Sequence, residues 1–251
     1  STDTEWLAPH FEKMLYDNAL LISVLSEALQ LTGKQRYREV IDETMEFIHR
    51  ELLHPAGGFY SALDADSEGV EGKFYTWSKE EAEQLLGNDA TLFCEYYNVT
   101  AGGNWEHTNI LWVRKSPANF AAEKGISEEE LLKTLHRCKE KLMQARSKRI
   151  RPLLDDKIIL GWNALMNTAC SKAYAVTGDK KYRQLAIENM NFLFQHFAVN
   201  RTDEFHHTWK NNQARYPAFL DDYAFLIEAL VHLQEVTGDI MWIDKAKALA
   251  K

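Results

Sequence analysis

The chain has 251 residues, of which 29 are basic and 37 acidic, giving a formal net charge of -8. This length is enough for one large domain, and the negative balance argues against nucleic acid or an anionic membrane surface as a partner. Apolar runs stay shorter than the roughly 18 residues of a membrane span. Three widely spaced cysteines form neither a CxxC pair nor a zinc motif. We therefore expect a cytoplasmic protein with no metal and no cofactor.

Three segments of the chain share one spacing, which indicates an internal repeat. In each segment a helix-forming stretch ends at Thr-Gly, and an aromatic residue follows the Gly four positions later. These positions are Thr32-Gly33 with Tyr37, Thr177-Gly178 with Tyr182, and Thr237-Gly238 with Trp242. Glycine readily adopts the left-handed conformation that ends helices. Each segment therefore predicts a hairpin of two antiparallel helices.

The two helices of each predicted hairpin differ in character. The second helix of the first hairpin places Tyr37, Ile41, Met45 and Ile48 on one face, as an outer helix does. Residues 164–176 have small and apolar side chains around most of the helix, which suits an inner position. Alternating inner and outer helices build an open solenoid or a closed ring. Because the repeats are unevenly spaced, the sequence favours an all-α fold of the (α/α)6 toroid type with long insertions.

Two insertions interrupt this pattern within a single predicted domain spanning residues 1–251. Residues 57–78 carry aromatic runs around an acidic, glycine-punctuated stretch, which predicts an inserted β-hairpin. Residues 99–126 form a polar loop insertion, in which residues 110–113 are expected to form a short strand. Ser78 and Ser127 each stand three residues before a Glu, the pattern of a helix N-cap.

Acidic and aromatic side chains gather before the predicted inner helices and in the first insertion. All inner helices of a ring begin at one end, so we expect these side chains to meet around one mouth. The candidate acid–base groups are Asp64, Asp66, Glu68, Asp156 and Asp222, with His10 as a proton-transfer group. The candidate substrate contacts are the aromatic residues Trp6, Tyr16, Tyr75, Trp77 and Trp162 and the polar residues Asn109, Arg151 and Asn163.

Carboxylates beside aromatic rings are typical of sugar sites. Glycoside hydrolysis needs an acid and a second carboxylate, whereas a sugar isomerase or epimerase moves a proton next to a carbonyl, commonly with His or Glu. His107, His206 and His207 are further candidates for that proton transfer. The competing interpretation is structural, with Asp156 and Asp222 as helix caps and the Asp64–Glu68 run as a solvated turn.

Several longer runs resemble one known family, the spermatogenesis-associated protein 20 family. The matching runs are Trp6 to Ala19, Gly58 to Ala62, Asp64 to Gly69, Glu71 to Tyr75, Arg151-Pro152, Asp155 to Ile158 and Trp162-Asn163. The resemblance implies a six-hairpin glycosidase-like toroid that follows an N-terminal thioredoxin-like domain. It therefore implies that the chain is a piece of a longer protein and that the thioredoxin-like domain is a partner of this one.

Two functions are compatible with these expectations. The first is a carbohydrate-processing enzyme domain that binds a sugar-like ligand and is either hydrolase-like or, as in N-acylglucosamine 2-epimerases, isomerase-like. The second is a non-catalytic ligand- or protein-binding module attached to the thioredoxin-like domain. Fold resemblance alone does not decide between them.

Overall fold

The computed structural model describes residues 2–199 and 203–251. The chain divides into two compact units. The insertion unit consists of Ser1–Glu12 and Asp64–Leu153, and the hairpin unit consists of Lys13–Leu63 and Leu154–Lys251. The single domain expected for residues 1–251 stays a prediction. Among the described residues, no helix has both the length and the apolar character needed to cross a lipid bilayer.

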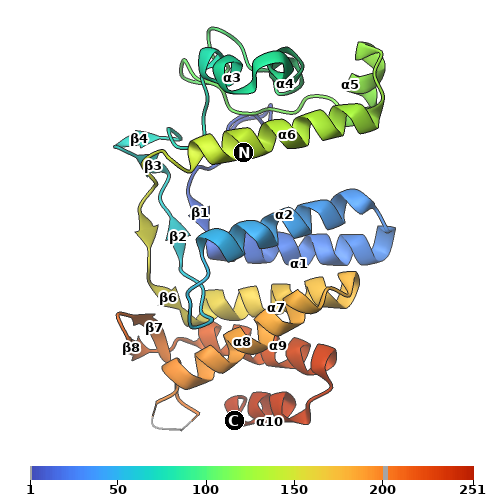
Figure 1. Ribbon diagram of the computed structural model, residues 1–251. Helices are drawn as coiled ribbons and strands as arrows, with labels where there is room; N and C mark the ends of the chain where they lie inside the picture. The colour runs from blue at the N-terminus through green and yellow to red at the C-terminus, as the bar shows by residue number, and fades with distance from the viewer. Residues whose placement is uncertain (1, 200–202) are drawn as a thin grey trace. The chain divides into compact units, whose positions relative to one another are not determined.

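Helical hairpins build the hairpin unit (Figure 1). Their helices are α1 (Leu15–Thr32) with α2 (Gln35–Glu51), α7 (Leu160–Thr177) with α8 (Lys180–Phe197), and α9 (Leu220–Thr237) with α10 (Ile240–Leu249). The first helix of each hairpin ends at the predicted glycine, with φ of 65° at Gly33 and 73° at Gly178 and Gly238. The predicted class, a helical protein built from antiparallel helical hairpins, is confirmed.

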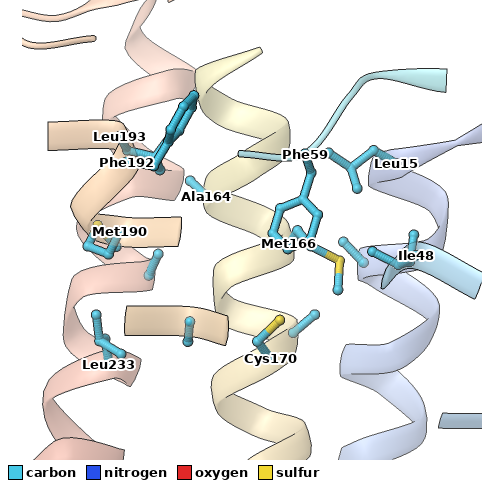
Figure 2. Packing of buried hydrophobic residues seen from close by; sticks show 14 of the residues in the cluster. Leu15, Ile48, Phe59, Ala164, Met166, Cys170, Met190, Phe192, Leu193 and Leu233 are labelled. Carbon is cyan, nitrogen blue, oxygen red and sulfur yellow. The ribbon is translucent and has the colours of Figure 1, made fainter. Parts of the chain in front are cut away.

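Helix α7 is the central inner helix of this unit. It packs against α1, α8 and α9, while α2 packs on α1 and α10 packs on α9. Ala164, Cys170 and Ala173 of α7 are fully buried, and such small side chains allow neighbouring helices to approach closely. Figure 2 shows Met166 and Cys170 of α7 among buried side chains from the neighbouring helices. The inner and outer positions predicted from helix composition therefore hold.

Short antiparallel sheets tie together the starts of the inner helices. One sheet has the order β1 (Lys13–Met14), β2 (Ala62–Leu63) and β5 (Leu154–Asp155), and the other has the order β6 (Ile158–Ile159), β7 (His206–Lys210) and β8 (Gln213–Pro217). Strand β1 leads into α1, β6 into α7 and β8 into α9 (Figure 1). The β6–β7–β8 sheet therefore links the start of α7 to the start of α9.

The insertion unit has its own small core. Its elements are β3 (Asp66–Ser67), β4 (Val70–Glu71), α3 (Lys79–Leu86), the 3-10 helix η1 (Gly87–Asp89), α4 (Ala90–Tyr96), α5 (Pro117–Lys124) and α6 (Glu128–Arg146). The hydroxyls of Ser78 and Ser127 accept hydrogen bonds from the third residue beyond them, at 3.0 and 3.1 Å, so both predicted N-caps are confirmed. Buried Phe93, Leu131 and Cys138 contribute to the core beneath these helices.

The two predicted insertions differ in detail from expectation. Within residues 57–78, β3 pairs with β4, whereas β2 pairs with β1 and β5. Within residues 99–126, helix α5 forms, and the described residues 110–113 form no strand. The Asn104 side chain accepts from the Ile110 N–H and donates to the Ile110 carbonyl, each at 2.9 Å. Those bonds use the backbone groups that a strand ladder would need.

Candidate functional site

The starts of the three inner helices come together in the hairpin unit. The rings of Tyr16 on α1 and Trp162 on α7 make an edge contact, with centroids 4.8 Å apart. The Gly161 N–H of α7 donates to Asp222 Oδ1 of α9 at 2.8 Å. A Cβ at position 161 would lie 2.8 Å from the same carboxylate oxygen. Glycine at 161 therefore allows the backbone of α7 to reach the carboxylate.

Asp222 is a buried carboxylate, 2% exposed, in the first turn of α9. Besides Gly161, it accepts from the Phe219 N–H at 2.9 Å, and its Oδ2 lies 2.7 Å from Nδ1 of His207. The helix N-terminus favours a negative charge at this position. Because an ionised carboxylate only accepts hydrogen bonds, Nδ1 of His207 carries the proton in this pair.

His207 lies on β7 and keeps 24% of its side chain exposed. Its ring packs against Phe219, with centroids 4.6 Å apart. In a neutral ring with its proton on Nδ1, the other ring nitrogen, Nε2, is a proton acceptor, and no partner for Nε2 is seen within the described part of the chain. We call His207 and Asp222 the dyad.

Sequence reasoning missed this pairing. Asp222 was a candidate acid–base group in its own right, whereas His207 was one of several histidines. In the structure Asp222 orients His207 and is itself nearly inaccessible. The two residues are 15 positions apart, and their contact depends on how β7 lies against α9. The signal that the sequence does contain is a histidine shortly before an acidic helix start.

Tyr216 adds a strained backbone conformation next to the dyad. Its φ is 61°, and a bulky residue in this left-handed region is an outlier that costs about 1–3 kcal/mol. Strand β8 pairs with β7 through His206 with Pro217 and Thr208 with Arg215, which places Tyr216 opposite His207. Tyr216 is 65% exposed, so its ring is available to a ligand.

Two other predicted residues of the hairpin unit have partners of their own. Asp156 forms an ion pair with Lys210 at 2.5 Å, and this hydrogen bond raises the pKa of Lys210. Asn163 is fully buried and brackets the backbone of Phe59, accepting from its N–H at 2.8 Å and donating to its carbonyl at 3.0 Å. Its amide also contacts Ile159 and Asn189. A ligand would have to displace these bonds to reach Asn163.

The remaining predicted acids lie in the insertion unit. Asp64, Asp66 and Glu68 are exposed at and around the β3–β4 hairpin. Asp64 accepts from the Asp66 N–H at 3.2 Å, and Glu68 pairs with Lys73 at 2.7 Å. His10 is also exposed. These groups belong to a different unit from the dyad.

The aromatic and amide candidates of the insertion unit divide by burial. Trp77 and Asn109 are buried; Asn109 donates to the Trp77 carbonyl at 3.1 Å, and the Arg149 guanidinium lies 4.0 Å from the centroid of the Trp77 ring. Both stabilise the unit from within. The half-buried Tyr75 ring stacks on Phe11, and burial raises the pKa of Tyr75.

The last two candidates are more accessible. Trp6 is 79% exposed with φ of 58°, and the exposed Arg151 lies 5.6 Å from the ring centroid of Phe74. No group of three or more His, Cys, Asp or Glu side chains suited to a metal ion occurs in residues 2–199 and 203–251.

Comparison with known proteins gives the chain its relatives. No protein-family model matches it. Human spermatogenesis-associated protein 20 is 34% identical over 99% of this chain, which spans 36% of that protein's length. Among solved structures, a sugar epimerase from a ruminal bacterium aligns at 15% identity and TM-score 0.36, covering 95% of this chain and 59% of that one. A D-mannose isomerase aligns at 15% identity and TM-score 0.38, covering 95% and 57%. The resemblance in the motifs is confirmed, and the chain is homologous to about a third of spermatogenesis-associated protein 20.

Proposed function

We propose that the hairpin unit is a sugar-converting domain in which His207 moves a proton next to a carbonyl group. The observation that carries this proposal is the 2.7 Å contact between His207 Nδ1 and the buried Asp222 carboxylate. A buried carboxylate that fixes the histidine tautomer leaves Nε2 as a positioned base. Tyr216 and Phe219 are both exposed beside this base, and aromatic faces of this kind suit the apolar face of a sugar ring.

The proposed step is an isomerisation or epimerisation. Nε2 of His207 takes the proton from the carbon adjacent to the carbonyl of an open-chain sugar, and the electron pair of that C–H bond forms an enediolate. The imidazolium that results lies against the Asp222 carboxylate, which stabilises its charge. Return of the proton to the former carbonyl carbon gives the isomer, with the hydroxyl proton of the neighbouring carbon passing to the former carbonyl oxygen. Return to the original carbon gives the epimer when the enediolate has turned its opposite face to His207, and either route restores neutral His207. No other reactant is consumed.

Proton transfer fits this geometry better than glycoside hydrolysis does. Hydrolysis needs two carboxyl groups on either side of the scissile bond, about 5–5.5 or 6.5–9.5 Å apart. In the hairpin unit Asp222 is buried and already takes part in three hydrogen bonds, and Asp156 is paired with Lys210. Neither is a free acid or nucleophile, whereas His207 presents a ring nitrogen.

Solvent isotope exchange tests the proposal directly. The protein is incubated in D2O with D-glucose, D-mannose or N-acetylglucosamine, and proton NMR follows loss of the signal from the hydrogen at C2. We expect exchange with at least one sugar in the wild type and none with His207→Ala. The matched control is His206→Ala, because His206 instead contacts the Phe197 carbonyl at 3.4 Å. Equal exchange in the two variants, or no exchange in the wild type, refutes the assignment.

The alternative is a binding module without turnover, attached to the thioredoxin-like domain that the family resemblance implies. This chain spans 36% of the relative's length, so the relative has room for such a domain outside the matched segment. A sugar that raises Tm but shows no C2 exchange would support this alternative.

A further inference from the structure

A tight turn in the insertion unit holds two residues in a conformation that their side chains disfavour. Glu106 and His107 have φ of 43° and 65°. The flanking residues pair with each other, Trp105 N–H donating to the Thr108 carbonyl at 3.0 Å and Thr108 N–H donating back at 2.8 Å. Two positive φ values between two residues that pair in an antiparallel bridge are typical of a type I′ turn, for which Asn-Gly is the preferred sequence.

Neighbouring residues hold this turn in its conformation. Gly103, at φ of 80°, lies so close that a Cβ there would be 2.5 Å from the backbone carbon of His107. Asn104 binds both backbone groups of Ile110 and also donates to the Asn98 carbonyl at 3.0 Å. The turn is therefore held in place by its neighbours although its own two residues disfavour it, a pattern that occurs at ligand-binding and catalytic sites.

This turn forms one wall of a cavity of about 670 Å³ within the insertion unit. Trp105 and Glu106 line the cavity from the turn, and Glu71 and Lys73 line it from the β3–β4 hairpin and the residues after it. Lys148, beyond the end of α6, lines it as well. The volume lies within the range of about 300–1,000 Å³ typical of small-molecule sites.

The lining combines both signs of charge with an aromatic ring. Glu106 and Glu71 are exposed carboxylates, Lys148 is an exposed ammonium group, and Lys73 is already paired with Glu68. Carboxylates accept hydrogen bonds from hydroxyl groups, and ammonium groups donate hydrogen bonds to hydroxyl groups. Because the cavity lining carries both signs of charge, it favours neither an anion nor a cation. The Trp105 ring is held in place by Phe11, with centroids 5.1 Å apart.

We propose that this cavity is a second ligand site, which binds a neutral carbohydrate with Trp105 as its stacking face and Glu106 as a hydroxyl acceptor. A sugar hydroxyl both donates and accepts, so it matches a lining with both carboxylate and ammonium groups. An aromatic ring adds the apolar contact that a sugar ring offers on one face. The site uses no atom of the dyad and does not depend on any proton transfer there.

NMR of the tryptophan indole groups tests the site without reference to turnover. The whole chain is labelled with ¹⁵N-tryptophan, and the Trp105 signal is assigned from its absence in Trp105→Phe. D-glucose, cellobiose and maltose are then titrated separately. We expect the Trp105 signal to shift with at least one sugar, and Glu106→Gln to need about tenfold more sugar because a charge-assisted hydrogen bond is lost. The control Glu140→Gln, an exposed residue of α6 outside the cavity lining, should titrate like the wild type.

The turn sequence supplies an independent test. Replacing Glu106 by Asn and His107 by Gly installs the preferred type I′ sequence, and we expect Tm to rise by about 2–4 °C while the sugar titration weakens. A Trp105 signal that no sugar moves overturns the proposal, as does a Glu106→Gln variant that titrates like the wild type. Because the readout is binding at Trp105, failure of the dyad's isotope exchange leaves this result standing, and the reverse also holds.

Discussion

Replacing Asp222 by Asn perturbs the contact on which the hairpin unit's site depends. The carboxylate accepts from the Gly161 N–H through Oδ1 and from the Phe219 N–H and His207 Nδ1 through Oδ2. An amide offers only one oxygen. If that oxygen takes the Oδ2 position, the amide nitrogen faces the Gly161 N–H, and a buried donor loses its acceptor.

The expected loss follows from those contacts. A buried donor left without an acceptor costs about 1–3 kcal/mol, and the two surviving bonds lose the part of their strength that came from the carboxylate charge. Removing the charge from the first turn of α9 costs roughly 0.3–1 kcal/mol more. Together these effects predict a decrease of about 2–4 kcal/mol in the free energy of unfolding of Asp222→Asn.

Urea denaturation followed by far-UV circular dichroism measures that decrease, provided that the slope of the transition is unchanged. Asp221→Asn is the matched control, because Asp221 is exposed in the same helical turn and its substitution removes the same charge from the helix start. We expect the control to lose no more than about 1 kcal/mol. If Asp222→Asn falls within about 0.5 kcal/mol of the control, the three hydrogen bonds do not stabilise the fold as argued.

Burial lowers the pKa of His54 and His196. Their contribution to stability is therefore complete above about pH 6.5, their ordinary pKa, and is lost as the pH falls. The urea midpoint should decrease between pH 7.5 and 5.5 by less in His54→Gln than in the wild type, and equal decreases would contradict this. Arg149→Lys should lower the free energy of unfolding by about 2–4 kcal/mol, because the guanidinium also donates to three backbone carbonyls. The control Arg114→Lys loses only a ring contact, so it should lower the free energy of unfolding by less than about 1 kcal/mol. Tyr216→Gly should raise the urea midpoint, because glycine relieves about 1 kcal/mol of backbone strain, and it should slow isotope exchange because the ring is lost. A lowered midpoint would show that the Tyr216 backbone is not strained.

The repeat was readable from the sequence because its signals are local. Gly33, Gly178 and Gly238 each end a helix by the conformation of one residue, and the next helix begins within the same short stretch. Neither feature depends on distant parts of the chain. The two serine caps were predictable for the same reason, since each hydroxyl binds a backbone group only three residues away.

The site was less predictable because its contacts are not local. Asn163 and Asn109 look like ligand-binding amides in the sequence, yet Asn163 brackets the backbone of Phe59 and Asn109 donates to the Trp77 carbonyl, both distant along the chain. Residue type does not distinguish an amide that holds a loop from one that holds a ligand. Asp222 was chosen for its charge, whereas the structure shows that its importance comes from the histidine that it orients.

Asp222 also links the packing of the inner helices to the chemistry proposed for His207. Its Oδ1 holds the start of α7 through Gly161, and its Oδ2 holds both the start of α9 and the imidazole ring. A change at Asp222 therefore alters stability and the histidine tautomer together, so lost activity in that variant cannot be assigned to either cause. Removing the His207 ring leaves the bonds from Gly161 and Phe219 to the carboxylate in place. The His207 variant is thus the one whose loss of isotope exchange reports on proton transfer alone.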